Sequence, residues 1–151
     1  MADYVIEKLD IADYKKCGNI WNMKNNPNTD IFYSEIVSGN RIVYIYKKNG
    51  VFIGEIALVF DKEDLDYTIP GQRVYVSHLV VKRKYRNHGI GGTLIDFIIG
   101  KAKELGFKEM SIGVDKDNTV ALNLYRHKGF TNIIFEGADE MGEYYKLVKY
   151  L

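Results

Sequence analysis

A short stretch near the middle of the chain has the residue types of an anion-binding site. An apolar run at residues 79–81 precedes a basic turn at 82–86, and three glycines, Gly89, Gly91 and Gly92, follow within four residues. Glycine lets a ligand approach the backbone closely, and the first N–H groups of a helix have no intrahelical partner. With the positive end of the helix dipole, these groups predict a phosphate site between a strand and a helix. A tight connection without a ligand is the alternative interpretation of such a turn.

Three further side chains could carry out acid–base chemistry. Tyr125 follows Asn118 by two helical turns, so the two share a helical face, and a tyrosine hydroxyl can donate a proton. His78 is one candidate general base, since histidine is the residue type suited to proton transfer near neutral pH. Glu55, next to Gly54 on the preceding strand, is another. Core packing for the tyrosine and ordinary strand positions for the other two are the alternatives. A base that acts through ordered water, or no dedicated base, is also open.

The apolar periodicity predicts the elements that must position these residues. Alternating residues predict strands, apolar residues at helical spacing predict helices, and Asn49-Gly50 is a hairpin signal of type I′. Asp10 can cap the first helix, Ser38-Gly39-Asn40 ends the second, and Gly106 is a suitable end for the third. The expected order is strand 4–9, helix 11–21, helix 30–37, strands 41–48, 51–60 and 73–81, helix 89–105, strand 110–114, a helix from 117 or 118 to 128, and strands 131–135 and 143–150.

Composition limits the class of protein. With 151 residues and no linker or repeat, the chain is expected to form a single domain over 1–151. A net charge of +1 gives no electrostatic case for nucleic acid or an acidic membrane. The single cysteine, Cys17, excludes an intrachain disulfide and is expected to be a small buried hydrophobe. With no secretory signal or long apolar span, the sequence indicates a cytoplasmic protein, and we expect no metal site.

Two motifs in this order resemble one enzyme family. The run Arg86-Asn87-His88-Gly89-Ile90-Gly91 matches the R/Q-x-x-G-x-G/A signature of the GCN5-related N-acetyltransferases (GNAT). Residues 118–130 resemble that family's second segment, N-x-x-A-x-x-L-Y-x-x-x-G-F. With the order of elements, the resemblance covers nearly the whole chain.

The resemblance implies a fold and a cofactor. The fold is an α/β (α+β) GNAT-like mixed, mainly antiparallel sheet of about seven strands with helices on both faces, in the order β-α-α-β-β-β-α-β-α-β-β. In that family the strands before and after the central helix splay apart, and the pantetheine arm of acetyl-CoA lies in the gap. The residues expected to bind the cofactor are Leu79, Val80, Val81, Arg86, Asn87, His88, Gly89, Ile90, Gly91, Gly92, Thr93 and Asn118.

The resemblance also implies a reaction. The chain is expected to be an acetyl-CoA-dependent N-acetyltransferase acting on a primary amine of a small molecule or of a protein or peptide. The family's matching tyrosine, here Tyr125, is a general acid toward the departing thiolate. Many relatives have a glutamate near the position of Ser77, so this departure leaves His78 and Glu55 as the candidate bases. A non-catalytic acyl-CoA-binding regulatory module on the same fold is the alternative.

The acceptor is expected near the first two helices and the loops at the end of the sheet. Trp21, Phe32, Tyr33 and the acidic loop 61–66 are the candidate lining residues. Carboxylates there could attract a cationic amine, although charged loops are often only solvated. The resemblance further suggests a homodimer.

Overall fold

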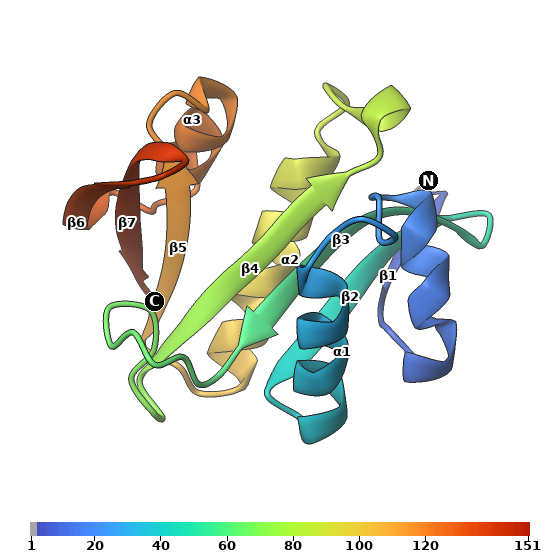
Figure 1. The fold of residues 1–151 in the computed structure, drawn as a ribbon, viewed down its shortest axis with the longest axis horizontal. Helices are drawn as coiled ribbons and strands as arrows, with labels where there is room; N and C mark the ends of the chain where they lie inside the picture. The colour runs from blue at the N-terminus through green and yellow to red at the C-terminus, as the bar shows by residue number, and fades with distance from the viewer. Residues whose placement is uncertain (1–2) are drawn as a thin grey trace. The chain divides into compact units, whose positions relative to one another are not determined.

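A computed structural model of the chain describes residues 3–151. Its elements follow the predicted order (Figure 1). The strands are β1 (Tyr4–Lys8), β2 (Arg41–Lys48), β3 (Val51–Val59), β4 (Arg73–Val81), β5 (Glu109–Asp115), β6 (Asn132–Asp139) and β7 (Gly142–Tyr150). The helices are α1 (Asn28–Ser38), α2 (Ile90–Glu104) and α3 (Thr119–His127), with 3₁₀-helices η1 (Ile11–Asn19) and η2 (Arg83–Tyr85).

The strands hydrogen-bond in the order β1-β2-β3-β4-β5-β7-β6. β4 and β5 pair in parallel, whereas β1–β2, β2–β3, β5–β7 and β6–β7 pair antiparallel. The predicted fold class, a mixed and mainly antiparallel sheet with helices, is therefore confirmed.

The chain divides into two compact units. The first contains the residues up to Val59 together with Ser77–Ile98, and the second contains Phe60–Val76 and Ile99–Leu151. β4 and α2 therefore each contribute residues to both units. The single domain expected over 1–151 stays a prediction.

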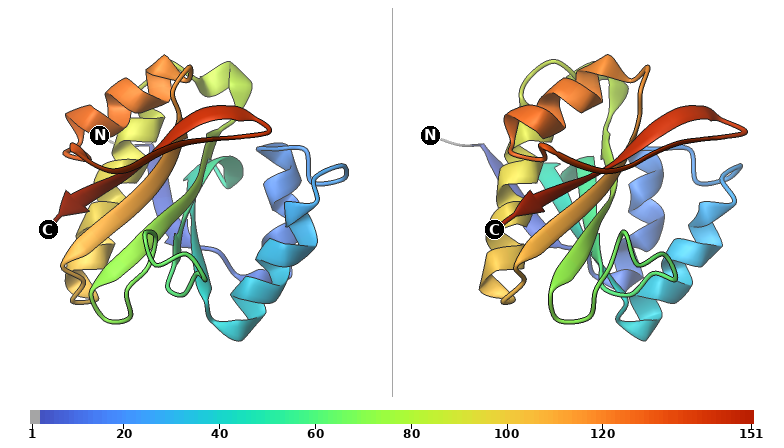
Figure 2. Two further views of the ribbon diagram at one scale, coloured as in Figure 1. Left: turned by 60° about the vertical axis from the view of Figure 1, so that its left-hand side comes forward. Right: turned by 90° about the vertical axis from the view of Figure 1, so that its left-hand side faces the viewer.

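In the first unit, the β2–β3 hairpin is covered on both faces. Asn49 and Gly50 connect the two strands with φ values of 53° and 76°, which is the type I′ geometry that the sequence predicts. One face, including Val43 and Ile45, packs against η1 and α1, which lie side by side in both views of Figure 2. On the other face, Tyr44 contacts Phe97 of α2, with the ring centroids 5.2 Å apart.

Two helices differ from the prediction in detail. The Asp10 side chain accepts a hydrogen bond from the Ala12 N–H, as predicted, but the helix that follows is 3₁₀. Its apolar residues recur every three positions, at Ile11, Tyr14 and Cys17, and this spacing fits three residues per turn. α1 begins at residue 28 rather than near 30, directly after Pro27. It ends within the predicted Ser38-Gly39-Asn40 segment, where Gly39 caps the helix in the left-handed conformation.

In the second unit, β7 pairs with both β5 and β6. The β6–β7 pairing runs from Asn132↔Val148 to Asp139↔Gly142, so β6 continues four residues beyond the predicted end at 135. The Asp139 side chain accepts a hydrogen bond from the Met141 N–H and closes this hairpin. Met110, Leu147 and Val148 are fully buried in this unit.

Candidate active site

The turn between β4 and α2 has the geometry of an anion site. Asn87 and Gly89 both have left-handed backbones, with φ values of 67° and 80°, and α2 begins at the next residue, Ile90. The Thr93 N–H bonds the Gly89 carbonyl, so the N–H groups of residues 90–92 precede the first intrahelical bond. An ideal Cβ built on Gly89 meets nothing within 4 Å, so the space beside this turn is open. The turn therefore fits a phosphate group.

The residues of this turn that are predicted to bind the cofactor differ in how exposed their side chains are. Residues 86–89 are exposed, but the Ile90 side chain is buried, so only its backbone is available. The Arg86 Nε donates to the Val81 carbonyl at 2.9 Å, which holds this side chain against the end of β4. The neighbouring Arg83 and Lys84 are exposed and add positive charge to the turn.

The end of β4 leads into this turn. Leu79, Val80 and Val81 are all half-buried, and Val80 packs against the apolar cluster beneath η1. His78, directly before them, has a left-handed φ of 57°, which is uncommon for a residue other than glycine and turns the strand locally. The pairing of β4 with β5 covers Arg73–Tyr75 and ends before His78.

Glu55 and His78, the two candidate bases, contact each other. The Glu55 Oε2 lies 3.1 Å from the His78 Nδ1, and the Glu55 side chain is 3% exposed. The Trp21 indole N–H donates to the other carboxylate oxygen, Oε1, at 2.6 Å. The His78 ring also packs edge-on against Trp21, with the centroids 4.7 Å apart. The three side chains form one hydrogen-bonded chain, Trp21–Glu55–His78, in which the carboxylate orients the imidazole.

Ser77 contacts a residue of β2. Its hydroxyl oxygen accepts a hydrogen bond from the Arg41 guanidinium at 3.0 Å, and the Arg41 Nε pairs with Glu35 at 3.1 Å. The guanidinium also lies over the Phe32 ring, 3.7 Å from its centroid. The sequence analysis missed Arg41, because no local signal links a residue of β2 to one that follows it by 36 positions.

Cys17 is buried, as predicted. It is fully inaccessible, and burial, followed by the nearby Glu55 carboxylate, raises the pKa of its thiol. A thiol in such surroundings is inert as a nucleophile.

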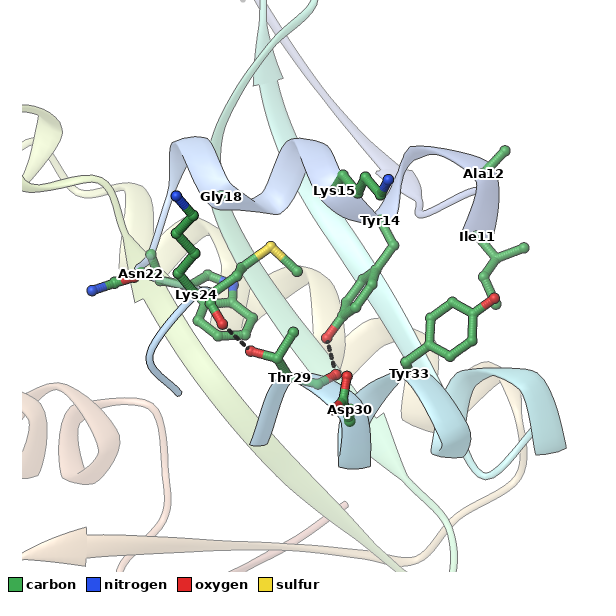
Figure 3. A pocket seen from close by; sticks show the side chains of 12 residues that line it. Ile11, Ala12, Tyr14, Lys15, Gly18, Asn22, Lys24, Thr29, Asp30 and Tyr33 are labelled. Atoms are coloured by element: carbon green, nitrogen blue, oxygen red, sulfur yellow. Dashed lines mark hydrogen bonds between the residues drawn. The ribbon is translucent and has the colours of Figure 1, made fainter. Parts of the chain in front are cut away.

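A hollow of about 1110 Å³ lies between η1 and α1 (Figure 3). Trp21 and Tyr33, two of the predicted acceptor residues, line it. Phe32 packs instead against the rings of Trp21 and His78, with centroids 6.2 and 5.1 Å away. The Tyr14 hydroxyl donates to the Thr29 carbonyl across the hollow and ties the two helices together.

Tyr125 lies in the second unit, on α3. Asn118 caps this helix, and its side chain accepts a hydrogen bond from the Ala121 N–H. Tyr125 is 8% exposed, and its hydroxyl forms no hydrogen bond with any residue of the described chain. Burial, followed by the nearby Tyr75, raises the pKa of Tyr125 to about 12. Asn118 and Tyr125 both line a second hollow, of about 400 Å³, within this unit, which fits the shared helical face predicted for them.

Part of the acidic loop is already neutralised. The Lys146 ammonium lies 2.5 Å from an Asp64 carboxylate oxygen and 3.0 Å from one of Asp66. Hydrogen bonding to Lys146 lowers the pKa of Asp64. Only part of the loop's negative charge therefore remains for an acceptor.

Neither a group of metal ligands nor a membrane-spanning helix is seen in the part of the chain that the structure describes. Among residues 3–151, no three His, Cys, Asp or Glu side chains are grouped as metal ligands would be. No helix in the same range is both long and apolar enough to cross a membrane.

Comparison with known proteins identifies the family. A sequence model of the Acetyltransferase (GNAT) family matches residues 6–130. N-alpha-acetyltransferase 30 of Saccharomyces cerevisiae is 32% identical over 78 residues, which is 50% of this chain but only 44% of that protein's length. The chain therefore belongs to the GNAT family of acetyltransferases, as its two motifs predict.

Solved structures share the fold. A GNAT acetyltransferase from Elizabethkingia anophelis with acetyl-CoA bound is 21% identical, with a TM-score of 0.71 over 100% of both chains. A chain of the NatC complex bound to Gag peptide and CoA is 22% identical, with a TM-score of 0.77 over 99% of both chains. At such low identity, these likenesses concern the fold alone.

Proposed function

We propose that this chain transfers the acetyl group of acetyl-CoA to a primary amine. The observation that carries the proposal is the turn before α2, where left-handed Asn87 and Gly89 leave the first N–H groups of the helix facing open space. Such N–H groups and the helix dipole suit the pyrophosphate of a coenzyme. Family membership supplies the class of coenzyme.

We infer that the cofactor-binding residues fall into two sets. Residues 86–93 hold the pyrophosphate, largely through backbone N–H groups. The backbone of Leu79, Val80 and Val81 holds the pantetheine arm and the thioester, while the Val80 side chain packs into the core. When bound, acetyl-CoA supplies an activated acyl group, so the protein has to position it and move protons.

The chain's own residues then have distinct tasks. His78 accepts the proton that the amine nitrogen loses as the new C–N bond forms, and Glu55 orients its ring. Tyr125 donates its proton to the sulfur as the C–S bond breaks. Asn118 caps α3 and so fixes the helix that carries Tyr125.

The acceptor follows from the relatives' chemistry. One relative is an N-alpha-acetyltransferase and one fold neighbour belongs to a complex bound to a peptide, which supports an amine of a protein or peptide as the acceptor, with an amine of a small molecule as the alternative. We further propose a cytoplasmic homodimer, because the chain has a single cysteine and the family resemblance favours dimers.

A direct assay tests this function. Purified protein is incubated with acetyl-CoA and a panel of primary amines, and thiol release is followed with a thiol-reactive dye. Mass spectrometry of each amine for the gain of one acetyl group identifies the acceptor. Transfer to an amine supports the proposal, whereas tight acetyl-CoA binding without transfer to any amine would favour the non-catalytic acyl-CoA-binding module.

The turn itself is tested by Gly91→Val. A branched side chain at the start of α2 obstructs the approach of phosphate to the backbone, so acetyl-CoA affinity should fall by about tenfold or more, on the order of 1.4 kcal/mol. Gly100→Val is the matched control, because it makes the same change later in α2, where an ideal Cβ meets nothing within 4 Å. Equal acetyl-CoA affinity of the two variants by calorimetry would remove the turn from the cofactor site.

A further inference from the structure

Arg41, the first residue of β2, is a buried cation to which the proposed transfer assigns no task. Its side chain is 2% exposed, although arginine is rarely buried unless it is paired. It is not a member of the hydrogen-bonded chain Trp21–Glu55–His78. Arg41 and the residues that it contacts on α1 and β4 all belong to the first unit, as His78 does.

The guanidinium links α1 to β4. Its Nε lies 3.1 Å from the Glu35 Oε1 on α1, and its Nη2 donates to the Ser77 hydroxyl oxygen on β4 at 3.0 Å. A guanidinium is planar and directs its N–H groups in fixed directions, whereas an ammonium is a compact point charge. Arg41 therefore fixes the position of Ser77 relative to α1.

Phe32 contacts both the guanidinium and the imidazole. The Arg41 Cζ lies 3.7 Å from the centroid of the Phe32 ring, and that centroid lies 5.1 Å from the centroid of the His78 ring. A cation over an aromatic face is attracted by the ring quadrupole, more strongly where water is excluded. Phe32 and Glu35 are three residues apart on α1, so both side chains that meet the guanidinium lie on one face of this helix. Arg41 thus fixes a ring that packs against His78.

The backbone of His78 depends on its surroundings. Its φ of 57° lies in the left-handed region, and such a conformation persists in a residue other than glycine only where neighbouring contacts hold it. Ser77, the residue directly before it, is 6% exposed and bonded to Arg41. The contacts of Arg41 therefore lead to His78 twice, through its backbone neighbour and through its ring.

We propose that Arg41 is a positioning residue for His78. This inference rests on the proposed acetyl transfer, with His78 as the base. Through Ser77 and Phe32, Arg41 holds the imidazole so that the amine nitrogen meets Nε2 in one geometry. A misplacement of about 1 Å can cost roughly 10²-fold in rate, so a residue outside the reaction can affect it strongly.

Arg41→Lys separates the geometry of the guanidinium from its charge. Lysine keeps a positive charge for Glu35. Its ammonium cannot also bond Ser77 and stack on Phe32 in the arrangement of the planar group. The single-turnover rate should fall by about three- to tenfold, while the affinity for acetyl-CoA stays the same. Arg73→Lys is the matched control, because it makes the same change at an arginine of the second unit that also pairs with a glutamate and is 12% exposed.

A double-mutant cycle with His78→Asn tests whether Arg41 acts through His78. In the His78→Asn background, Arg41→Lys should cause no further loss of the residual rate, because the group that it positions is gone. A merely structural role would lower the rate by the same factor in both backgrounds.

A second measurement does not depend on transfer. The chain has three histidines, and in protein with isotope-labelled histidine the ring signals of His78 are those missing from His78→Asn. In Arg41→Lys these signals should shift or broaden, while those of His88 and His127 stay in place. In Arg73→Lys the His78 signals should match those of the wild type.

The outcomes separate this inference from the proposed function. A wild-type single-turnover rate in Arg41→Lys, or an equal loss in both backgrounds of the cycle, would overturn the inference while leaving acetyl transfer intact. Absence of transfer to every amine would instead contradict the proposed function. Unchanged His78 signals in Arg41→Lys would overturn the inference in either case.

Discussion

His78→Asn should lower kcat for acetyl transfer by about 10²–10⁴-fold, the usual contribution of a general base. Asparagine is the best replacement because His78 has a left-handed φ of 57°, and asparagine is among the residues that tolerate this conformation. The variant therefore keeps the local course of β4 and a polar side chain, but it loses the nitrogen that accepts a proton. Acetyl-CoA affinity and the melting temperature should change little.

Glu55→Gln tests whether Glu55 sets the tautomer of His78, because the Trp21 indole fixes the orientation of the new amide group. An indole N–H can only donate, so the amide oxygen has to face Trp21 and the NH₂ group has to face His78 Nδ1. A donor at that position makes Nδ1 an acceptor and puts the ring proton on Nε2. The imidazole is then in the wrong tautomer to accept a proton from the amine, so kcat should fall although the side chain keeps its size and both contacts.

The two variants are measured with single-turnover kinetics, which report the chemical step alone. Glu7→Gln, the same chemical change at an exposed residue of β1 outside the hydrogen-bonded chain, controls for general effects on the first unit. A wild-type single-turnover rate in His78→Asn would remove His78 from the reaction and leave a water-mediated base or no dedicated base. Loss of activity in His78→Asn with full activity in Glu55→Gln would contradict the orienting role of Glu55.

The sequence predicts the strands better than the helices of this fold, for physical reasons. β2 and β4 have the predicted bounds, because alternation and the flanking turn residues mark both ends. η1 is 3₁₀ because its apolar residues recur every three positions, a spacing that is close to that of an ordinary α-helix and so does not distinguish the two from sequence. β6 extends past 135 because its pairing with β7, rather than its own pattern, sets its length.

The candidate site was predictable where its residues are contiguous. The turn of residues 86–93 is visible as a motif, and Asn118 and Tyr125 follow from helical periodicity. Glu55 of β3 contacts His78 of β4, which is 23 positions later in the sequence. The hydrogen bond from Trp21 to Glu55 joins residues that are 34 positions apart. Such contacts depend on the packing of η1 and its following loop against β3, and no local pattern encodes them. The partners of Arg41 and Lys146 were missed for the same reason.

Tyr125→Phe should lower kcat by about 10²–10⁴-fold, because it removes the donor that we assign to the departing thiolate. The ring and its packing remain, including the edge-on contact with Phe130 at 6.3 Å between centroids. Burial raises the pKa of the hydroxyl to about 12, so Tyr125 stays protonated throughout an ordinary assay range. The loss of rate should therefore be the same at pH 7 and at pH 9.

Tyr125→Phe should separate an effect on the reaction from an effect on folding stability. The Tyr125 hydroxyl forms no hydrogen bond within residues 3–151, so its removal breaks no bond of the folded chain, and the melting temperature should be unchanged. Tyr14→Phe provides the contrast, since that hydroxyl donates to the Thr29 carbonyl and its loss should reduce stability by about 0.5–1.5 kcal/mol. If Tyr125→Phe instead keeps a wild-type single-turnover rate, the hydroxyl has no part in thiolate departure, and Tyr125 serves only to pack against residues such as Phe130.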